Sequence, residues 1–150
     1  MIEFRREPAG SPAAQELLAA MEQEMLALYD MPSMPTPAST EELDPPLGGA
    51  YVVGWEDGRA VAGGALKRLG PGVAEVKRMY VIPEARSRGH ARRLLEAIED
   101  TARELGYERV RLDTGASQPH AKALYESAGY RTVGDYNDNP YAAYHGEKVL

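Results

Sequence analysis

The apolar pattern of the chain changes its period at Pro83, and this change constrains the fold more than any other feature. Before Pro83, two apolar stretches flank Asp57-Gly58, a dipeptide that favours a tight hairpin turn. Gly70-Pro71-Gly72 marks a second turn, and "VAEVKRMYVI" follows it. The sequence therefore predicts an antiparallel meander up to Ile82.

After Pro83 the apolar residues recur about every 3.6 positions, which predicts a helix that ends near Gly106. "ERVRLDT", residues 108–114, alternates as a strand. A strand, a helix and a strand in this order imply a right-handed crossover and a parallel pair. The helical stripe consists of Ala91, Leu94, Leu95, Ile98, Ala102 and Leu105.

A further helix is predicted near the N-terminus, after a short first strand at "IEF". Ser11 followed by Pro12 is typical of an N-cap and a first helical position. The segment from Met31 to Gly49, with five prolines and three acidic residues, is predicted to be a loop. The apolar residues at helical spacing are Leu17, Leu18, Met21, Met25, Leu28 and Tyr29.

The C-terminal third is expected to add a last helix and two strands. Ser117 is the predicted N-cap of that helix, which carries Leu124 and Tyr125 and ends at Gly129. "YRTVGDY" and "YHGEKVL" are predicted strands. With 150 residues and 43% hydrophobic content, the chain is expected to form a single domain over residues 1–150.

Composition excludes several classes of function. A formal net charge of -6 and a pI of about 5.1 argue against general binding to nucleic acid or an anionic membrane. The absence of cysteine excludes disulfides, thiolate metal sites and cysteine nucleophiles. The start lacks a signal-peptide pattern, and no stretch approaches the roughly 18 apolar residues that span a bilayer. We expect a soluble, cytoplasmic protein.

A cationic cluster opens the second helix of this acidic chain. "EARSRGHARRLLEAIE", residues 84–99, holds four arginines within eight positions around Gly89. A helix N-terminus presents unpaired N–H groups and a partial positive charge, so it binds phosphate readily. The stretch lacks the Gly-Lys-Ser/Thr ending of a nucleoside-triphosphate loop and the three spaced glycines of a dinucleotide fingerprint. The alternative is a glycine turn followed by a solvated arginine face.

Residues 74–130 resemble the acetyl-CoA-binding half of a GNAT-superfamily N-acetyltransferase. The pyrophosphate motif of that family, Arg/Gln-x-x-Gly-x-Gly/Ala, matches Arg86, Gly89 and Ala91. The order also matches: a strand ending in "V-x-P", the motif, a helix, a strand and "ALYESAGY". The resemblance implies an α/β fold: a mixed, mostly antiparallel sheet of six to seven strands with a central splayed parallel pair, flanked by helices.

The resemblance also implies where acetyl-CoA binds. The diphosphate is expected on the backbone of residues 86–91, and the pantetheine arm along the strand end at residues 79–81, where the parallel strands must separate after Val81 and Val110. The family often has an asparagine near the start of the last helix, for which Ser117 or Gln118 stands here. The expected cofactor-binding residues are Met79, Tyr80, Val81, Arg86, Ser87, Arg88, Gly89, His90, Ala91, Arg92, Ser117 and Gln118.

Two side chains are candidates for the chemistry that the resemblance implies. Acyl transfer to an amine needs an unprotonated amine, a site for oxyanion charge and a proton for the leaving thiolate. Glu75 is the candidate general base, Tyr125 the candidate general acid, and a backbone N–H near Val81 the candidate oxyanion donor. Alternatively, Glu75 is a strand carboxylate paired with Lys77 or Arg68, and Tyr125 is a core-edge aromatic.

The acceptor is expected to be a small amine or amino-acid derivative. Family acceptor sites use the first helix, the following loop and the last strands, which here bring acids and the tyrosines of "GDYNDNPYAAYHGE". Carboxylates and aromatics suit a cationic amine. Alternatively, these acids are solvated and these tyrosines belong to the core. The loop acids in question are Glu41, Glu42 and Asp44.

Three other interpretations remain. The acceptor could be a protein lysine or N-terminus, the chain could be a non-catalytic acyl-CoA-binding module, or it could be a ligand-free interaction domain. No metal site is expected, because His90, His120 and His145 lie far apart without paired ligand spacing. A homodimer is possible by analogy with the family.

Overall fold

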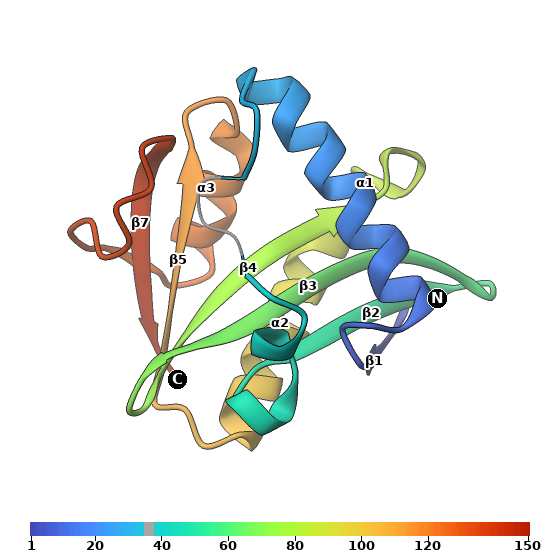
Figure 1. The fold of residues 1–150 in the computed structure, drawn as a ribbon, viewed down its shortest axis with the longest axis horizontal. Helices are drawn as coiled ribbons and strands as arrows, with labels where there is room; N and C mark the ends of the chain where they lie inside the picture. The colour runs from blue at the N-terminus through green and yellow to red at the C-terminus, as the bar shows by residue number, and fades with distance from the viewer. Residues whose placement is uncertain (35–37) are drawn as a thin grey trace.

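The computed structural model describes residues 1–34 and 38–150, which form one mixed sheet with helices on both faces (Figure 1). The described part of the sheet has seven strands in the order β1-β2-β3-β4-β5-β7-β6. Every neighbouring pair is antiparallel except β4 and β5. The strands are β1 (Glu3–Arg6), β2 (Ala50–Glu56), β3 (Arg59–Gly70), β4 (Val73–Val81), β5 (Arg109–Gly115), β6 (Arg131–Thr132) and β7 (Ala142–Val149).

The expected fold class is confirmed. Ser11 caps the first helix by accepting a hydrogen bond from the N–H of Ala14 at 3.2 Å. The prediction that Ser117 caps the last helix is wrong, because Gln118 occupies the N-cap position and makes no capping bond. The helices are α1 (Pro12–Tyr29), α2 (His90–Glu104) and α3 (Pro119–Ser127), with 3-10 turns at Glu41–Leu43, Pro45–Leu47 and Pro83–Ala85.

Turn chemistry defines the ends of these elements as the sequence indicated. Asp57 and Gly58, which join β2 to β3, have φ angles of 51° and 76°, as a tight hairpin turn requires. Gly106 follows α2 with a φ of 90°, a conformation that glycine adopts without steric cost.

The parallel strands β4 and β5 pair only at their beginnings. Three residue pairs connect them, from Val73 with Arg109 to Glu75 with Arg111. Beyond these pairs the two strands diverge, and Figure 1 shows the wedge that opens between their arrowheads. The splayed pair is therefore confirmed. The separation begins directly after Glu75 and not, as expected, after Val81.

A β-bulge lies in β4 beside this wedge. Tyr80 pairs with Gly63 and Lys77 with Ala65, so that Arg78 and Met79 together face Gly64. Arg78 has a φ of 57°, in the left-handed region. A bulge bends its strand and redirects the side chains that follow it.

The bulge changes which face of the sheet the strand residues occupy. With uninterrupted alternation, residues 76 and 80 would share a face. Instead Val76 packs in the core beneath α2, whereas Tyr80 packs in the core beneath α1. The redirected end of β4 then lines the wedge with different side chains than a regular strand would.

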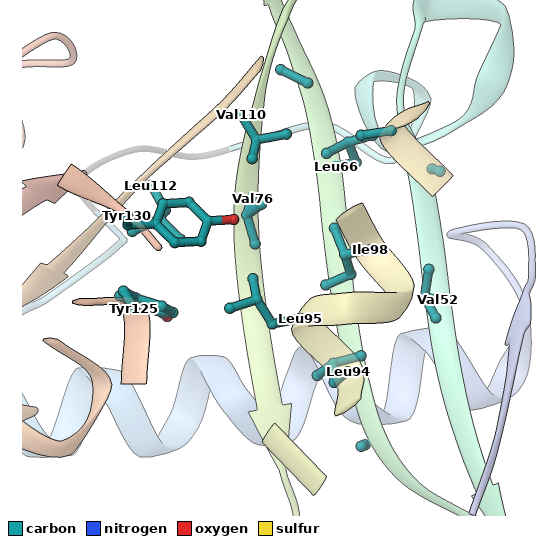
Figure 2. Close-up of a cluster of buried hydrophobic side chains, with 14 of the residues drawn as sticks. Val52, Leu66, Val76, Leu94, Leu95, Ile98, Val110, Leu112, Tyr125 and Tyr130 are labelled. Carbon is teal, nitrogen blue, oxygen red and sulfur yellow. The ribbon is translucent and has the colours of Figure 1, made fainter. Parts of the chain in front are cut away.

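Two glycines allow both helices to approach the sheet closely. A Cβ on Gly63 would lie 2.9 Å from Leu17 on the α1 face, and a Cβ on Gly64 would lie 2.5 Å from Ile98 on the α2 face. Figure 2 shows the α2 core, in which Leu94, Leu95 and Ile98 lie against strand residues. Burying each such side chain contributes about 1.5–3 kcal/mol. None of the helices in the described residues is long and apolar enough to cross a membrane.

Candidate active site

A cavity of about 600 Å³ lies between the end of β4, the start of α2 and the start of α3. Three segments that are separated in the sequence line it: residues 24–28 of α1, residues 79–94, and residues 117–125. Its lining includes all the expected cofactor-binding residues except Arg88: Met79, Tyr80, Val81, Arg86, Ser87, Gly89, His90, Ala91, Arg92, Ser117 and Gln118.

The N-terminus of α2 opens onto this cavity with its backbone exposed. Gly89 is the N-cap residue with a φ of 79°, and no side chain of the described residues caps the helix. A Cβ added to Gly89 would meet no atom within 4 Å, so the space above it is open. Ser87 also has a left-handed φ, of 64°. Such backbone, at the positive end of a helix dipole, binds anions.

Arg86 closes one side of the large cavity. Its Nε donates to the carbonyl of Val81 at 2.9 Å, and its terminal nitrogen bonds both carboxylate oxygens of Glu24 at 2.9 and 2.8 Å. The guanidinium also lies 5.5 Å from the ring centre of Tyr80. Arg86 therefore ties α1 to the strand end while it keeps a positive charge at the cavity wall.

Two neighbours of Gly89 lie against Glu56 at the end of β2. Arg88 forms an ion pair with Glu56 at 2.9 Å and does not line the large cavity. His90 is 5% exposed, and neither of its ring nitrogens has a hydrogen-bond partner among the described residues. Its Nε2 lies 3.5 Å from Glu56 Oε2. The geometry supports His90 as a cavity residue and gives no such support to Arg88.

The start of α3 contributes amide and hydroxyl groups. Gln118 Oε1 accepts a hydrogen bond from the Tyr29 hydroxyl at 3.0 Å, which connects α3 to the end of α1. Ser117 also lines the large cavity. Gln118 thus has a fixed position near the site where an asparagine is common in the family.

A second cavity, of about 130 Å³, adjoins the first on the side of β5. Its charged lining residues are Lys77, Arg78 and Asp113. Tyr29 and Tyr141 meet edge to face at its rim with ring centres 5.9 Å apart. The remaining wall is rich in methionine: Met21, Met25, Met31, Met34 and Met79.

Tyr125 lies where the two cavities meet. Four residues line both of them: Met25, Met79, Gln118 and Tyr125. The Tyr125 hydroxyl lies 3.9 Å from the sulfur of Met79, and its ring packs beside Tyr130 at the edge of the core shown in Figure 2. Burial raises the pKa of this hydroxyl above its ordinary value, so it stays protonated at neutral pH. Tyr125 therefore lies both at the edge of the core and at the junction of the two cavities.

Glu75 is buried behind the smaller cavity and does not line it. Its carboxylate accepts hydrogen bonds from the Tyr136 hydroxyl at 2.7 Å and from Asn137 Nδ2 at 3.1 Å. Lys77 Nζ lies 3.3 Å away, so the ion pair that the sequence offered as an alternative role is present. Asn137 Nδ2 also lies 2.6 Å from Asp113 Oδ2. One amide therefore connects Glu75 to a carboxylate on the cavity wall.

The loop acids Glu42 and Asp44 make contacts away from both cavities. Glu42 pairs with Lys67 and accepts a hydrogen bond from the N–H of Ser39, and Asp44 accepts a hydrogen bond from the N–H of Ala9. These acids fasten the loop to the rest of the fold and line neither cavity. Of the tail tyrosines, Tyr141 reaches the smaller cavity, while Tyr136 bonds Glu75 and Tyr144 lies in the α2 core.

Sequence reasoning missed the smaller cavity and its charged residues. Arg78, Asp113 and Asn139 gave no motif signal. The methionines did give a signal, because Met21 and Met25 are four residues apart and therefore lie on the same face of a helix. The three histidines do not gather, and no group of three His, Asp or Glu side chains in residues 1–34 and 38–150 could hold a metal ion.

Comparisons with known proteins show what the chain is similar to. A sequence model of the acetyltransferase (GNAT) family matches residues 12–130. The chain is 34% identical to the uncharacterised N-acetyltransferase YsnE of Bacillus subtilis over 131 residues, covering 81% of this chain and 87% of that protein. It is 40% identical to an IAA acetyltransferase of Azospirillum brasilense over 92 residues, covering 61% of this chain and 59% of that protein.

Solved structures share the fold along the whole chain. An acyl-CoA N-acyltransferase of Klebsiella pneumoniae has a TM-score of 0.80 at 27% identity, with 100% of this chain and 98% of that chain covered. A GNAT acetyltransferase of Elizabethkingia anophelis, solved with acetyl-CoA bound, has a TM-score of 0.72 at 16% identity, with 99% and 98% covered.

Proposed function

The chain belongs to the GNAT acetyltransferase family, and on that premise we propose that it moves an acetyl group from acetyl-CoA to the primary amine of a small molecule by direct attack in a ternary complex. The observation that carries this proposal is the meeting of two cavities at Tyr125. One cavity suits a long phosphorylated donor, and the other suits a compact acceptor.

The donor binds in the large cavity. Its diphosphate lies on the N–H groups at the start of α2, where Gly89 allows close approach and Arg86 and Arg92 supply positive charge. Beyond Glu75, β5 no longer pairs with β4, so the edge of β4 at residues 79–81 is open to a ligand. The pantetheine amides pair with that edge. The acetyl-CoA complex of the Elizabethkingia protein, which has the same fold, supports this donor.

The reaction moves protons off the nitrogen and one proton onto the sulfur. The ammonium loses a proton and its nitrogen attacks the thioester carbon, while a backbone N–H near Val81 stabilises the oxyanion. The C–S bond breaks as the amide forms, the thiolate takes a proton from the Tyr125 hydroxyl, and the second proton of the attacking nitrogen returns to the Tyr125 oxygen through solvent. The position of that hydroxyl at the cavity junction supports this role, because proton transfer depends on fixed geometry.

Glu75 receives the proton from the amine, acting through water because its carboxylate does not line the acceptor cavity. The hydrogen bonds from Tyr136 and Asn137 hold it in an orientation suited to that role. Asp113 is the competing candidate, since it lines the cavity and shares the Asn137 amide with Glu75.

Thiol release from acetyl-CoA with a panel of amines tests the proposal. We expect acetyl-CoA-dependent release with at least one small amine and none without an amine. Release with lysine peptides or protein N-termini alone would assign a protein acceptor instead. Binding of acetyl-CoA without turnover of any amine would favour a non-catalytic acyl-CoA-binding module.

A further inference from the structure

The wall of the smaller cavity is built from side chains that adapt to an apolar group. Six methionines are present in the chain, and all except Met1 line this cavity. They come from three places: α1, the segment that follows it, and the bulge of β4. Methionine is flexible and polarizable, so a wall of this kind accommodates apolar side chains of differing shape. The tyrosines at the rim add aromatic surface.

Charged groups of both signs share the same small cavity. Burial lowers the pKa of Lys77 and of Arg78, while Glu75 opposes this for Lys77 and Glu22 opposes it for Arg78. Lys77 is neutralised by Glu75 at 3.3 Å. The carboxylate of Asp113 accepts hydrogen bonds from Asn137 at 2.6 Å and from Asn139 at 3.2 Å, both on Oδ2. The wall therefore carries a guanidinium and an oriented carboxylate.

A ligand that carries both charges complements this wall better than a simple amine does. The guanidinium of Arg78 has five N–H donors in a planar fork, a geometry that suits a carboxylate. Asp113 attracts the ammonium form of an amine. Desolvated charges are costly unless paired, so each wall group favours the opposite charge on the ligand.

We propose that the acceptor is an α-amino acid with an apolar side chain, whose carboxylate binds Arg78, whose amine lies toward Asp113 and Tyr125, and whose side chain packs on the methionine wall. This inference rests on the proposed acetyl transfer and specifies its acceptor. The bulge in β4 contains Arg78 and Met79, and both residues line the smaller cavity.

The test compares matched acceptors in the thiol-release assay. The probes are leucine, methionine, phenylalanine and tryptophan, each beside its decarboxylated amine: isoamylamine, 3-(methylthio)propylamine, phenethylamine and tryptamine. The α-amine of each amino acid is less basic than its decarboxylated partner, so each kcat/KM is expressed per concentration of unprotonated amine. After that correction the carboxylate is the main difference between the two members of a pair. We expect at least one amino acid to exceed its decarboxylated partner tenfold or more in kcat/KM.

Variants of Arg78 then assign the carboxylate contact. Arg78→Gln should lower kcat/KM for the preferred amino acid tenfold or more and change it less than threefold for the decarboxylated amine, and Arg78→Lys should restore part of the loss. The control is Arg103→Gln, which removes the same charge from an exposed pair with Asp100 on α2 and should leave both values unchanged.

The outcomes separate this inference from the proposed function. If the decarboxylated amines match or exceed every amino acid, or if Arg78→Gln lowers both members of a pair equally, the amino-acid assignment is overturned while acetyl transfer stands. The same holds if none of these probes is acetylated but another amine is. If acetyl-CoA binds nowhere and no amine releases thiol, the proposed function itself fails.

Discussion

The hydroxyl of Tyr125 lies 3.9 Å from the sulfur of Met79, at the point where the two cavities join. A neutral hydroxyl at this distance from a thioether gains little from the contact. The hydroxyl of Tyr125 therefore contributes little to folding, whereas its ring packs in the core.

Tyr125→Phe should lower kcat by a hundredfold or more, because it deletes the proposed proton donor and keeps the ring. The affinity for acetyl-CoA should change little, and the free energy of unfolding should fall by less than about 1 kcal/mol, since the hydroxyl makes only a weak contact. Steady-state kinetics and chemical denaturation on one preparation measure both quantities.

Tyr130→Phe is the matched control for that variant. Tyr130 lies in the same cluster, with its ring centre 5.9 Å from that of Tyr125, but its hydroxyl donates to the buried carboxylate of Glu99 at 2.7 Å. Its loss should cost about 1–3 kcal/mol of stability and leave turnover nearly unchanged. The reverse pattern in the two variants would contradict the role of Tyr125.

Gly89→Val should weaken binding of both acetyl-CoA and free CoA about tenfold or more, because it crowds the backbone on which the diphosphate lies. Its φ of 79° also strains any larger residue. Gly58→Val controls for this strain, since Gly58 has a φ of 76° and equally open surroundings in the β2–β3 turn. Calorimetry measures the CoA affinity of both variants. Equal affinities would contradict a phosphate site at the N-terminus of α2.

Glu75→Gln should reduce turnover most at low pH and least at high pH, where solvent already supplies the unprotonated amine. The pH profile of kcat/KM measures this. The Asp113→Asn profile decides between the two carboxylates, because the one that accepts the proton shows the pH-dependent loss. A uniform loss in Glu75→Gln at every pH would assign Glu75 the role of a buried partner of Lys77.

Glu147 should contribute to the acid sensitivity of the fold. Hydrogen bonds from Arg111 and then Arg131 lower the pKa of its carboxyl below the ordinary 4.5. A lowered folded-state pKa stabilises the fold above the unfolded value and loses this effect as the pH falls through the folded value. Urea midpoints should therefore fall below about pH 4.5 in the wild type.

The Glu147→Gln variant isolates that contribution. It should be less stable than the wild type at neutral pH and should show a flatter decline in acid. Asp100→Asn, in an exposed pair with Arg103, should reproduce the wild-type decline. A decline in Glu147→Gln as steep as in the wild type would show that other carboxylates carry the acid sensitivity.

The sequence determined the order of the elements and the start of α2, because local signals encode them, whereas the splay of the parallel pair followed from the family resemblance. A period of two or of 3.6 reflects burial of one face, and Gly89 reflects a backbone conformation within a few residues. The residues around the large cavity could therefore be named in advance, although the side chain of Arg88 pairs with Glu56 instead.

Only the tertiary structure decided the smaller cavity and the setting of Glu75. The bulge at Arg78 places Val76 and Tyr80 on opposite faces, which no alternating pattern indicates. The methionines of α1, the segment after it and β4 converge because helix packing brings distant segments together. Contacts between remote segments depend on the whole packed chain, whereas a motif depends on its neighbours in sequence, so the sequence could indicate the large cavity at the start of α2 but not the smaller one beside it.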